Sequence, residues 1–176
     1  DHLPRQEPVC LLIIDLDGFK FINDTYGHPF GDKALRAIST LLIAMFSGHG
    51  YVARLAGDEF AVILRKTGLE DATRTANKLH AAISTTQLEL AVGDCQLRCS
   101  IGVASAPMHG KNAQDLVSAA DVALYHSKRR GRNRVEVLSP DNSKAVRSIF
   151  NQGFQLRAAL GQGTLVRAFQ PICDIH

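Results

Sequence analysis

The feature that most constrains the fold is a short, unbroken apolar run that ends in two acids. Residues 9–17 read VCLLIIDLD, without the alternation of polar and apolar residues that marks a half-buried strand. Such a run is typical of a strand that is buried on both faces and lies near the centre of its sheet. The chain must therefore supply helices that cover that sheet.

A hairpin is predicted over residues 51–64. The segments YVARL and EFAVIL flank Gly57 and Asp58, a dipeptide that suits a two-residue turn between antiparallel strands. This arrangement places Asp58 and Glu59 side by side at the tip of the hairpin.

The rest of the first 140 residues alternates between helix and strand patterns. Helices are expected over 18–27, 33–46, 69–84 and 113–131, and further strands over 96–106 and 133–138. This order favours an α+β fold, in which helices flank a mostly antiparallel central sheet. We place the end of this domain at residue 140, expect a linker helix over 141–163, and expect residues 164–176 to open a further domain.

Composition narrows the class of protein. Hydrophobic residues make up 45% of the chain and charged residues 21%, which is the balance of a soluble globular protein. The net charge of +3 is too small to indicate a nucleic-acid partner by itself. The four cysteines form no C-x-x-C pair, so we expect them to be reduced and structural, as in a cytoplasmic protein.

Nothing in the sequence indicates a membrane span. No apolar stretch approaches the roughly 20 residues that cross a bilayer, and no signal peptide is visible. The chain opens at Asp1 without a methionine, so we interpret it as a piece of a longer cytoplasmic protein. Such a parent protein has room for a membrane anchor upstream.

Acids at the end of the first strand and at the hairpin tip indicate a candidate metal site. If the hairpin pairs with the first strand, Asp15 and Asp58 come close enough to share a Mg²⁺ ion, which prefers carboxylate and phosphate oxygens. In the alternative interpretation, Asp17 caps the following helix and Asp58 merely tolerates a turn conformation. The pattern alone leaves both interpretations open.

A basic cluster, HSKRRGRNR, occupies residues 126–134 at the end of the last predicted helix. It is consistent with a solvated helix end, where the helix dipole favours cations. It is also consistent with a nucleic-acid patch, although no aromatic residues interleave with the charges. A third interpretation is that two of the cations hold a triphosphate.

Two further polar residues, Asn23 and Asp32, lie near the ends of the first two predicted helices. Helix capping is a sufficient explanation for Asp32. A carboxylate is also well suited to guanine, which presents N1–H and N2–H₂ side by side as donors, whereas adenine does not. The sequence pattern does not choose between these roles.

Four segments together resemble the GGDEF family of diguanylate cyclases. They are DLDGFKFINDTYGHPFGDKAL, RLAGDEFAVIL, SIGVA and AADVALYHSKRRGRNRV, which occur in the family's order and cover roughly residues 9–137. The resemblance implies a palm-like fold related to nucleotidyl cyclases, with residues 1–140 as the GTP-binding domain. It implies that two GTP molecules are joined into cyclic di-GMP with release of pyrophosphate. Each domain would hold one GTP, so the working unit would be a homodimer.

The resemblance also implies a role for individual residues, with Mg²⁺ or Mn²⁺ as cofactor. These residues are Asp15 and Asp58 as metal ligands, Asp58 and Glu59 as catalytic acids, Asn23 and Asp32 as readers of guanine, and Lys20, Lys128 and Arg132 as phosphate ligands. The implied reaction is an in-line attack of a 3′-hydroxyl on an α-phosphate. Such a reaction depends on positioning and on neutralisation of phosphate charge.

The chain departs from the family pattern in three places. Ala56 replaces the first glycine of the signature, and glycine permits backbone angles and close approaches that alanine does not. Residues 47–50 read SGHG where the family's inhibitory Arg-x-x-Asp normally lies, so we expect no product inhibition through that site. The family's usual N-terminal D-x-L-T-G-L-x-N-R segment is absent.

The end of the chain carries a second resemblance. LRAALGQGTLVRAFQPICDI is similar to the entry into an EAL-type cyclic di-GMP phosphodiesterase domain, of which residues 164–176 would be the first strand. An alternative function is therefore a catalytically weak, GTP-binding regulatory domain that controls such a phosphodiesterase. A third is a dimerisation scaffold that has lost nucleotide binding.

Overall fold

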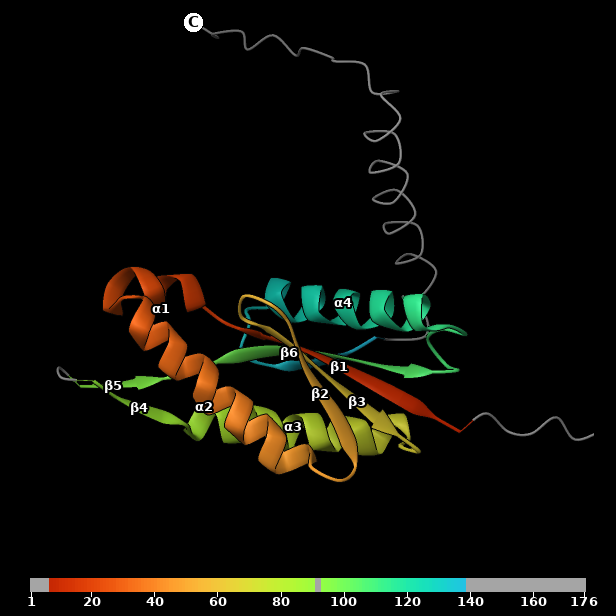
Figure 1. The fold of residues 1–176 in the computed structure, drawn as a ribbon. Coiled ribbons are helices and arrows are strands. Elements are labelled where there is room, and N and C mark those ends of the chain that lie inside the picture. The colour runs from red at the N-terminus through yellow and green to blue at the C-terminus, as the bar shows by residue number, and fades with distance from the viewer. Residues whose placement is uncertain (1–6, 91–92, 139–176) are drawn as a thin grey trace, which may run out of the picture. The chain divides into compact units, whose positions relative to one another are not determined.

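The computed structural model describes residues 7–90 and 93–138, which form a five-stranded sheet with β1 in the middle (Figure 1). The strands are β1 (Val9–Leu16), β2 (Gly50–Ala56), β3 (Glu59–Arg65), β6 (Cys99–Ala106) and β7 (Val135–Val137), in the spatial order β2-β3-β1-β6-β7. β1 pairs antiparallel with β3 and β6, and β2 pairs antiparallel with β3. β7 is parallel to β6. The predicted mostly antiparallel sheet, with the 9–17 strand central, is confirmed.

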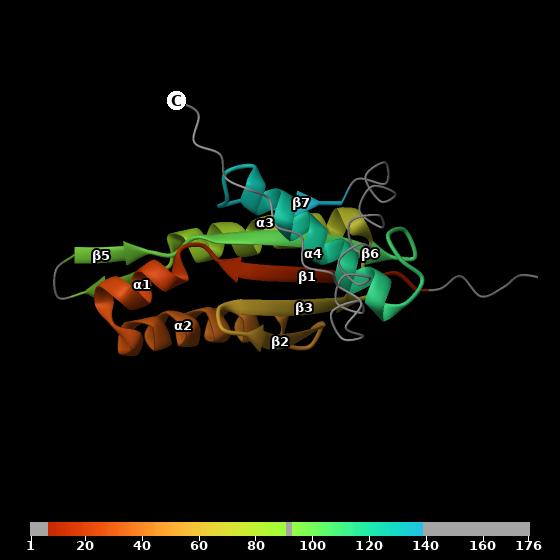
Figure 2. The same cartoon turned by 90° about the horizontal axis from the view of Figure 1, so that it is seen from above.

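Helices cover both faces of this sheet (Figures 1 and 2). They are α1 (Phe19–Tyr26), α2 (His28–Phe46), α3 (Leu69–Thr85) and α4 (Ala113–Arg129). On one face, α2 and α3 share a buried core with alternate residues of β1, namely Cys10, Leu12 and Ile14. On the other face, α4 packs against β1, β6 and β7. α1 leads from the end of β1 into α2 and packs against it.

The helices bury the apolar stripes that the sequence predicts. The residues of α3 that face the core are Ala72, Ala76, Leu79 and Ile83, which recur at helical spacing. α4 begins at Ala113, as expected, and Asn112 caps it, because the Asn112 side chain accepts a hydrogen bond of 2.8 Å from the backbone N–H of Asp115. The position of α4 also determines where the side chains at its C-terminal end lie.

The approach of α4 to the sheet depends on Gly102 of β6. A Cβ atom at this position would lie 2.2 Å from the carbonyl oxygen of Ala120 and 2.3 Å from the backbone nitrogen of Leu124. Both contacts are to helix backbone, which cannot rotate away as a side chain can. The absence of a side chain at Gly102 therefore sets how closely α4 lies on β6.

α4 leaves part of its face of the sheet uncovered in the described part of the chain. An apolar pocket of about 510 Å³ lies between α4 and strands β2 and β3. Its lining includes Tyr51, Leu55, Ile63 and Val117, all of which are exposed large apolar residues. The apolar core on this face is therefore concentrated over β1 and β6.

Two predicted elements differ from the structure. α2 begins at His28, four residues before Asp32, because Pro29 has a fixed φ that suits the first turn of a helix. Asp32 thus lies inside the helix, and the interpretation of Asp32 as a cap is wrong. The single strand expected over 96–106 is divided into β5 (Gly93–Gln96) and β6, because Leu97 turns into the core between them. β5 pairs with β4 (Gln87–Leu90) in a separate two-stranded sheet.

Other sequence predictions concern cysteines, membrane spans and domain boundaries. Cys10, Cys95 and Cys99 are free thiols, as expected, whereas Cys173 lies outside the described residues. Among the helices of residues 7–90 and 93–138, none is long and apolar enough to cross a bilayer. The linker helix over 141–163 and the strand within 164–176 also lie outside the described residues, so these boundaries stay predictions.

Replacement of Gly102 by alanine tests the close packing of α4. The new Cβ would overlap helix backbone, so we expect the free energy of unfolding to fall by about 3 kcal/mol, the upper end of the usual cost of overpacking. Gly68→Ser is the control, because a Cβ at Gly68 meets no atom within 4 Å, and its effect should stay within about 0.5 kcal/mol. Equal losses in urea unfolding of the two variants would contradict this account.

Candidate functional site

Residues from four separate segments line one pocket at the end of β1. The pocket has a volume of about 230 Å³ and is bounded by the end of β1, the start of α1, the hairpin tip and the end of α4. Its lining residues are Asp15, Leu16, Asp17, Gly18, Phe19, Lys20, Asp58, Lys128 and Arg132. Five residues singled out from the sequence are therefore brought together here: Asp15, Lys20, Asp58, Lys128 and Arg132.

The pairing of β1 with β3 brings the two predicted metal ligands together. Asp15 lies opposite Glu59 in the antiparallel register, so Asp58 is the first residue beyond the paired strand. The backbone N–H of Leu16 also donates to the carbonyl of Asp58 at 3.4 Å. The turn itself has Gly57 in the left-handed region, with a φ of 47°. The hairpin tip thus holds Asp58 beside the end of β1.

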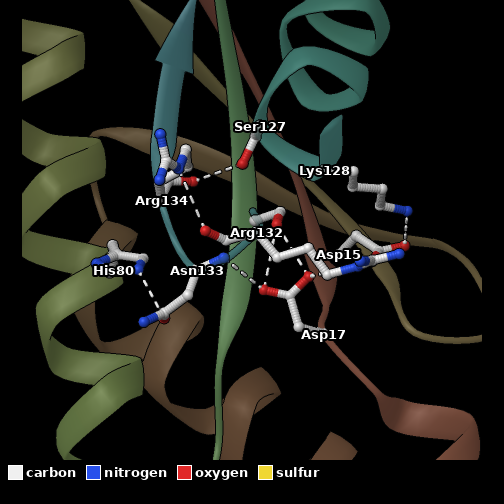
Figure 3. A network of polar contacts seen from close by, with 9 residues as sticks. Asp15, Asp17, His80, Ser127, Lys128, Arg132, Asn133 and Arg134 are labelled. Atoms are coloured by element: carbon white, nitrogen blue, oxygen red, sulfur yellow. Dashed lines mark hydrogen bonds and ion pairs between the residues drawn. The ribbon is translucent and has the colours of Figure 1, made fainter. Parts of the chain in front are cut away.

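Asp15 is a buried carboxyl group with acids on one side and a cation on the other. Its carboxylate accepts a hydrogen bond of 2.6 Å from the Lys128 ammonium of α4 (Figure 3). Burial raises the pKa of Asp15, and the charges of Asp58 and Glu59 raise it further, whereas Lys128 opposes both effects. Around Asp15, two acids and burial thus act against the ionised carboxylate, and the Lys128 ammonium acts for it.

Asp121 of α4 extends this group of acids. Burial raises the pKa of Asp121, and the nearby charge of Glu59 adds to the shift, whereas Lys128 lowers it. Lys128 therefore interacts with carboxyl groups on both β1 and α4. A divalent cation or the charge of Lys128 can relieve the repulsion among these acids.

The donor set fits a hard cation such as Mg²⁺ or Mn²⁺ better than a metal that prefers thiolate or imidazole ligands. Among the described residues, no group of three or more His, Cys, Asp and Glu side chains is placed to hold a metal ion. Asp15 and Asp58 alone offer two carboxylates. Mg²⁺ commonly takes one or two protein carboxylates and completes its octahedron with waters and substrate phosphates.

Asp17 does not cap the following helix, so that interpretation is wrong. The N-cap position of α1 is Gly18, and no side chain caps the helix there. The Asp17 carboxylate instead accepts hydrogen bonds from the Ser100 hydroxyl at 2.9 and 3.1 Å and from the backbone N–H of Asn133 at 2.9 Å. Sequence reasoning missed this role, for which the only signal was the repeat of acids in the DLD segment.

Asn23 and Asp32 lie outside the lining of this pocket. Asn23 is on α1 and Asp32 is on α2, two helices that pack against each other. A Cβ atom at Gly31 would lie 2.0 Å from the Asn23 amide oxygen, so the Asn23 side chain rests against the residue that precedes Asp32. The Asn23 side chain, in the middle of α1, thus lies against the first turns of α2, next to the position of Asp32 in the chain.

The basic cluster divides into two groups. Arg130 pairs with Glu136 at 2.8 Å, Arg134 lies 3.8 Å from Glu136, and Arg129 lies over the ring of Tyr125. These three arginines are engaged with neighbouring side chains. Lys128 and Arg132 face the pocket instead, which favours the anion-binding interpretation of the cluster over a continuous nucleic-acid patch.

Ala56 is the last residue of β2 and pairs with Glu59 across the hairpin. It is exposed and is not among the residues that line the pocket. The methyl group of Ala56 therefore lies outside the lining of this pocket.

Comparison with known proteins identifies a family and relatives that are named as diguanylate cyclases. Residues 1–134 match the family described as diguanylate cyclase, GGDEF domain. The chain is 43% identical over 131 residues to diguanylate cyclase DosC of Escherichia coli. This match covers 74% of this chain and 28% of that protein. It is 34% identical over 162 residues to MucR of Pseudomonas aeruginosa, a bifunctional diguanylate cyclase and cyclic di-GMP phosphodiesterase, with coverage of 92% and 24%.

Solved structures show the same architecture. The active GGEEF domain of a diguanylate cyclase from Vibrio cholerae superposes with a TM-score of 0.71 at 30% identity, and the match covers 76% of this chain and 85% of that one. The chain spans about a quarter of the length of the curated relatives named above. From the family match and the shared palm-like fold, we conclude that this chain belongs to the GGDEF family of diguanylate cyclases.

Proposed function

We propose that this domain binds GTP with Mg²⁺ or Mn²⁺ and joins two GTP molecules into cyclic di-GMP, releasing pyrophosphate. The observation that carries the proposal is the pocket in which Asp15 and Asp58 lie beside Lys20, Lys128 and Arg132. Carboxylates for a hard cation next to cations for phosphates form a matched site for a metal–triphosphate complex.

The residues of the pocket divide the work of the reaction. Lys20, Lys128 and Arg132 hold and neutralise the phosphates, so that the α-phosphate lies in line with the attacking hydroxyl. A metal ion held by Asp15 and Asp58 supplies charge stabilisation on the phosphate oxygens. We assign to the Glu59 carboxylate, whose residue pairs with Asp15 in the sheet, the role of accepting the proton of the 3′-hydroxyl.

Guanine is assigned to Asn23 and Asp32 on the α1–α2 pair. The first residues of α1 line the phosphate pocket, and Asn23 follows on the same helix. Asp32 is on α2, which packs against α1. A nucleotide can thus place its phosphates at the end of β1 and its base between these helices. One such pocket holds one GTP, so we propose that a second copy of the domain supplies the other.

A second candidate function follows from the match to MucR. That match covers 92% of this chain, more than the described domain, and MucR is named as bifunctional. The alternative is a weakly catalytic domain, residues 1–140, that binds GTP and controls an EAL-type domain beginning at residues 164–176 after a linker over 141–163. Calorimetry that shows GTP binding without formation of cyclic di-GMP would favour this alternative.

Asp58→Asn tests the proposed activity. Loss of one metal-binding carboxylate should lower the rate of cyclic di-GMP formation by about 100-fold or more, since a catalytic metal contributes several kcal/mol. The melting temperature should hardly change, because Asp58 lies at a hairpin tip. Glu70→Gln, at an exposed acid of α3, is the control and should keep full activity. Turnover in Asp58→Asn equal to that of the unmodified protein would refute the assignment.

Asp32→Ala tests the reading of guanine. Removal of this carboxylate should reduce the preference for GTP over ATP by about tenfold or more, because a polar base contact is worth roughly 1–3 kcal/mol. Competition binding measures the preference. Asp71→Ala, an exposed acid on α3, should leave it unchanged. The assignment fails if Asp32→Ala and Asp71→Ala behave alike.

Asp15→Asn tests the cost of the buried acid. The pKa of Asp15 is raised in the folded state, so its ionised form destabilises the fold at pH values above that pKa. Asp15→Asn should therefore be more stable than the unmodified protein at about pH 7, and this gain should shrink as the pH falls towards the ordinary aspartate pKa of about 4, below which the carboxyl is protonated in both the folded and the unfolded state. Activity should be lost. Urea unfolding at both pH values checks the prediction, and a gain that grows on acidification would contradict it.

A further inference from the structure

The turn that follows α4 has an unusual backbone. Gly131, Arg132 and Asn133 are three consecutive residues with positive φ, at 106°, 61° and 49°. Asparagine tolerates this region better than other residues with a side chain, so Arg132 is the strained position of the three. Contacts with the surrounding structure must therefore hold the turn in place.

The two ends of the turn are held by backbone hydrogen bonds. The N–H of Arg132 donates to the carbonyl of Ser127 at 3.0 Å, which continues the end of α4. The carbonyl of Arg134 accepts from the N–H of Ile101 at 2.9 Å, which ties the exit of the turn to β6. Neither bond involves Asn133, the residue that follows the strained Arg132.

Asn133 is held by two side chains from distant segments (Figure 3). The Asp17 carboxylate accepts from its backbone N–H at 2.9 Å, and the His80 ring of α3 is hydrogen-bonded to its amide oxygen at 3.1 Å. Asp17 is itself fixed, because it is 8% exposed and accepts two contacts from the fully buried Ser100 hydroxyl. The Asp17 carboxylate, which follows β1, thus holds the turn at Asn133, next to Arg132.

The same acid lies next to the Arg132 side chain. The Arg132 Nε atom is 4.0 Å from the Asp17 carboxylate, although the arginine side chain is 63% exposed. A long exposed side chain without a fixed backbone would sample many rotamers and lose entropy on binding. Two donors, the Ser100 hydroxyl and the Asn133 N–H, already bind the Asp17 oxygens, so this carboxylate is engaged by the protein although it lies in the lining of the pocket.

We propose that Asp17 is a positioning residue, which fixes the left-handed turn of residues 131–133 and thereby directs the Arg132 guanidinium into the nucleotide pocket. His80 supports the same turn from α3. In this proposal, Asp17 and His80 act on the position of Arg132 and do not bind the phosphates themselves. The inference rests on the proposed function, because that function assigns Arg132 to the phosphates.

A double-mutant cycle tests this coupling. The probe is a GTP analogue with a methylene bridge between the α- and β-phosphates, which cannot release pyrophosphate, and calorimetry with Mg²⁺ measures its affinity. Asp17→Ala and Arg132→Ala should each weaken binding by about tenfold, a usual size for coupled residues. The double variant should bind no more weakly than Arg132→Ala alone. Unchanged affinity in Asp17→Ala, or losses that add in the double variant, would overturn the proposal.

Conservative and control variants separate positioning from general damage to the fold. Asp17→Asn keeps an oxygen that can accept from the Asn133 N–H, so it should recover most of the affinity lost in Asp17→Ala. Ser105→Ala removes another buried hydroxyl of β6, away from the turn, and should leave affinity unchanged. Failure of Asp17→Asn to recover affinity, or an equal loss in Ser105→Ala, counts against the proposal.

His80→Ala keeps the proposal testable if Asp17→Ala does not fold. His80 is partly exposed and contacts the turn through Asn133, so its removal should weaken binding, with no further loss in the Arg132→Ala background. Additive losses would overturn the inference. If the unmodified protein does not bind the analogue, the proposed function itself fails. If Arg132→Ala weakens binding but the Asp17 and His80 variants do not, this inference alone fails.

Discussion

The antiparallel pairing of β1 with β3 is the constraint on which the rest of the site depends. Its register sets Asp15 opposite Glu59, and the two-residue turn then leaves Asp58 beside the end of β1. A shift of one residue would turn the core-facing side chains of β3, Phe60, Val62 and Leu64, to the other face of the sheet. The apolar core therefore protects the register, and the register in turn places the acids. The positions of the acids at the end of β1 therefore depend on the burial of the apolar residues in the middle of the strand.

The helix α4 brings the opposite charge to the same place. Gly102 lets the helix backbone touch β6, and the last turn of the helix then carries Lys128 to Asp15. The result is a cluster in which burial and neighbouring acids work against the ionised form of Asp15. Sites of this kind commonly reduce stability and are kept because a ligand or a metal ion completes them. The hydrogen bonds of Asp17 are a second feature of this kind, because they maintain a strained turn next to the pocket.

Much of the fold could be predicted because its elements carry local signals. The unbroken run of β1, the Gly57–Asp58 turn and the apolar stripe of α3 each follow from residue spacing over a few turns of chain. The misses have local reasons as well. Pro29 starts α2 earlier than Asp32 suggests, and Leu97 divides a strand pattern because its side chain enters the core. Neither effect is visible in the alternation of polar and apolar residues.

The sequence by itself determined the order of the elements, the acids that end β1 and the hairpin, and the resemblance to the GGDEF family. These properties depend on residue types and spacing within short segments. The family resemblance names Lys128 and Arg132 within the basic cluster, but the physical reason comes from the tertiary structure: these two line the pocket, whereas Arg130 and Arg134 lie beside Glu136. The tertiary structure alone decided the role of Asp17, whose hydrogen-bond donors, Ser100 and Asn133, lie more than eighty residues away along the chain. Contacts at such separations arise from packing, which no local pattern records.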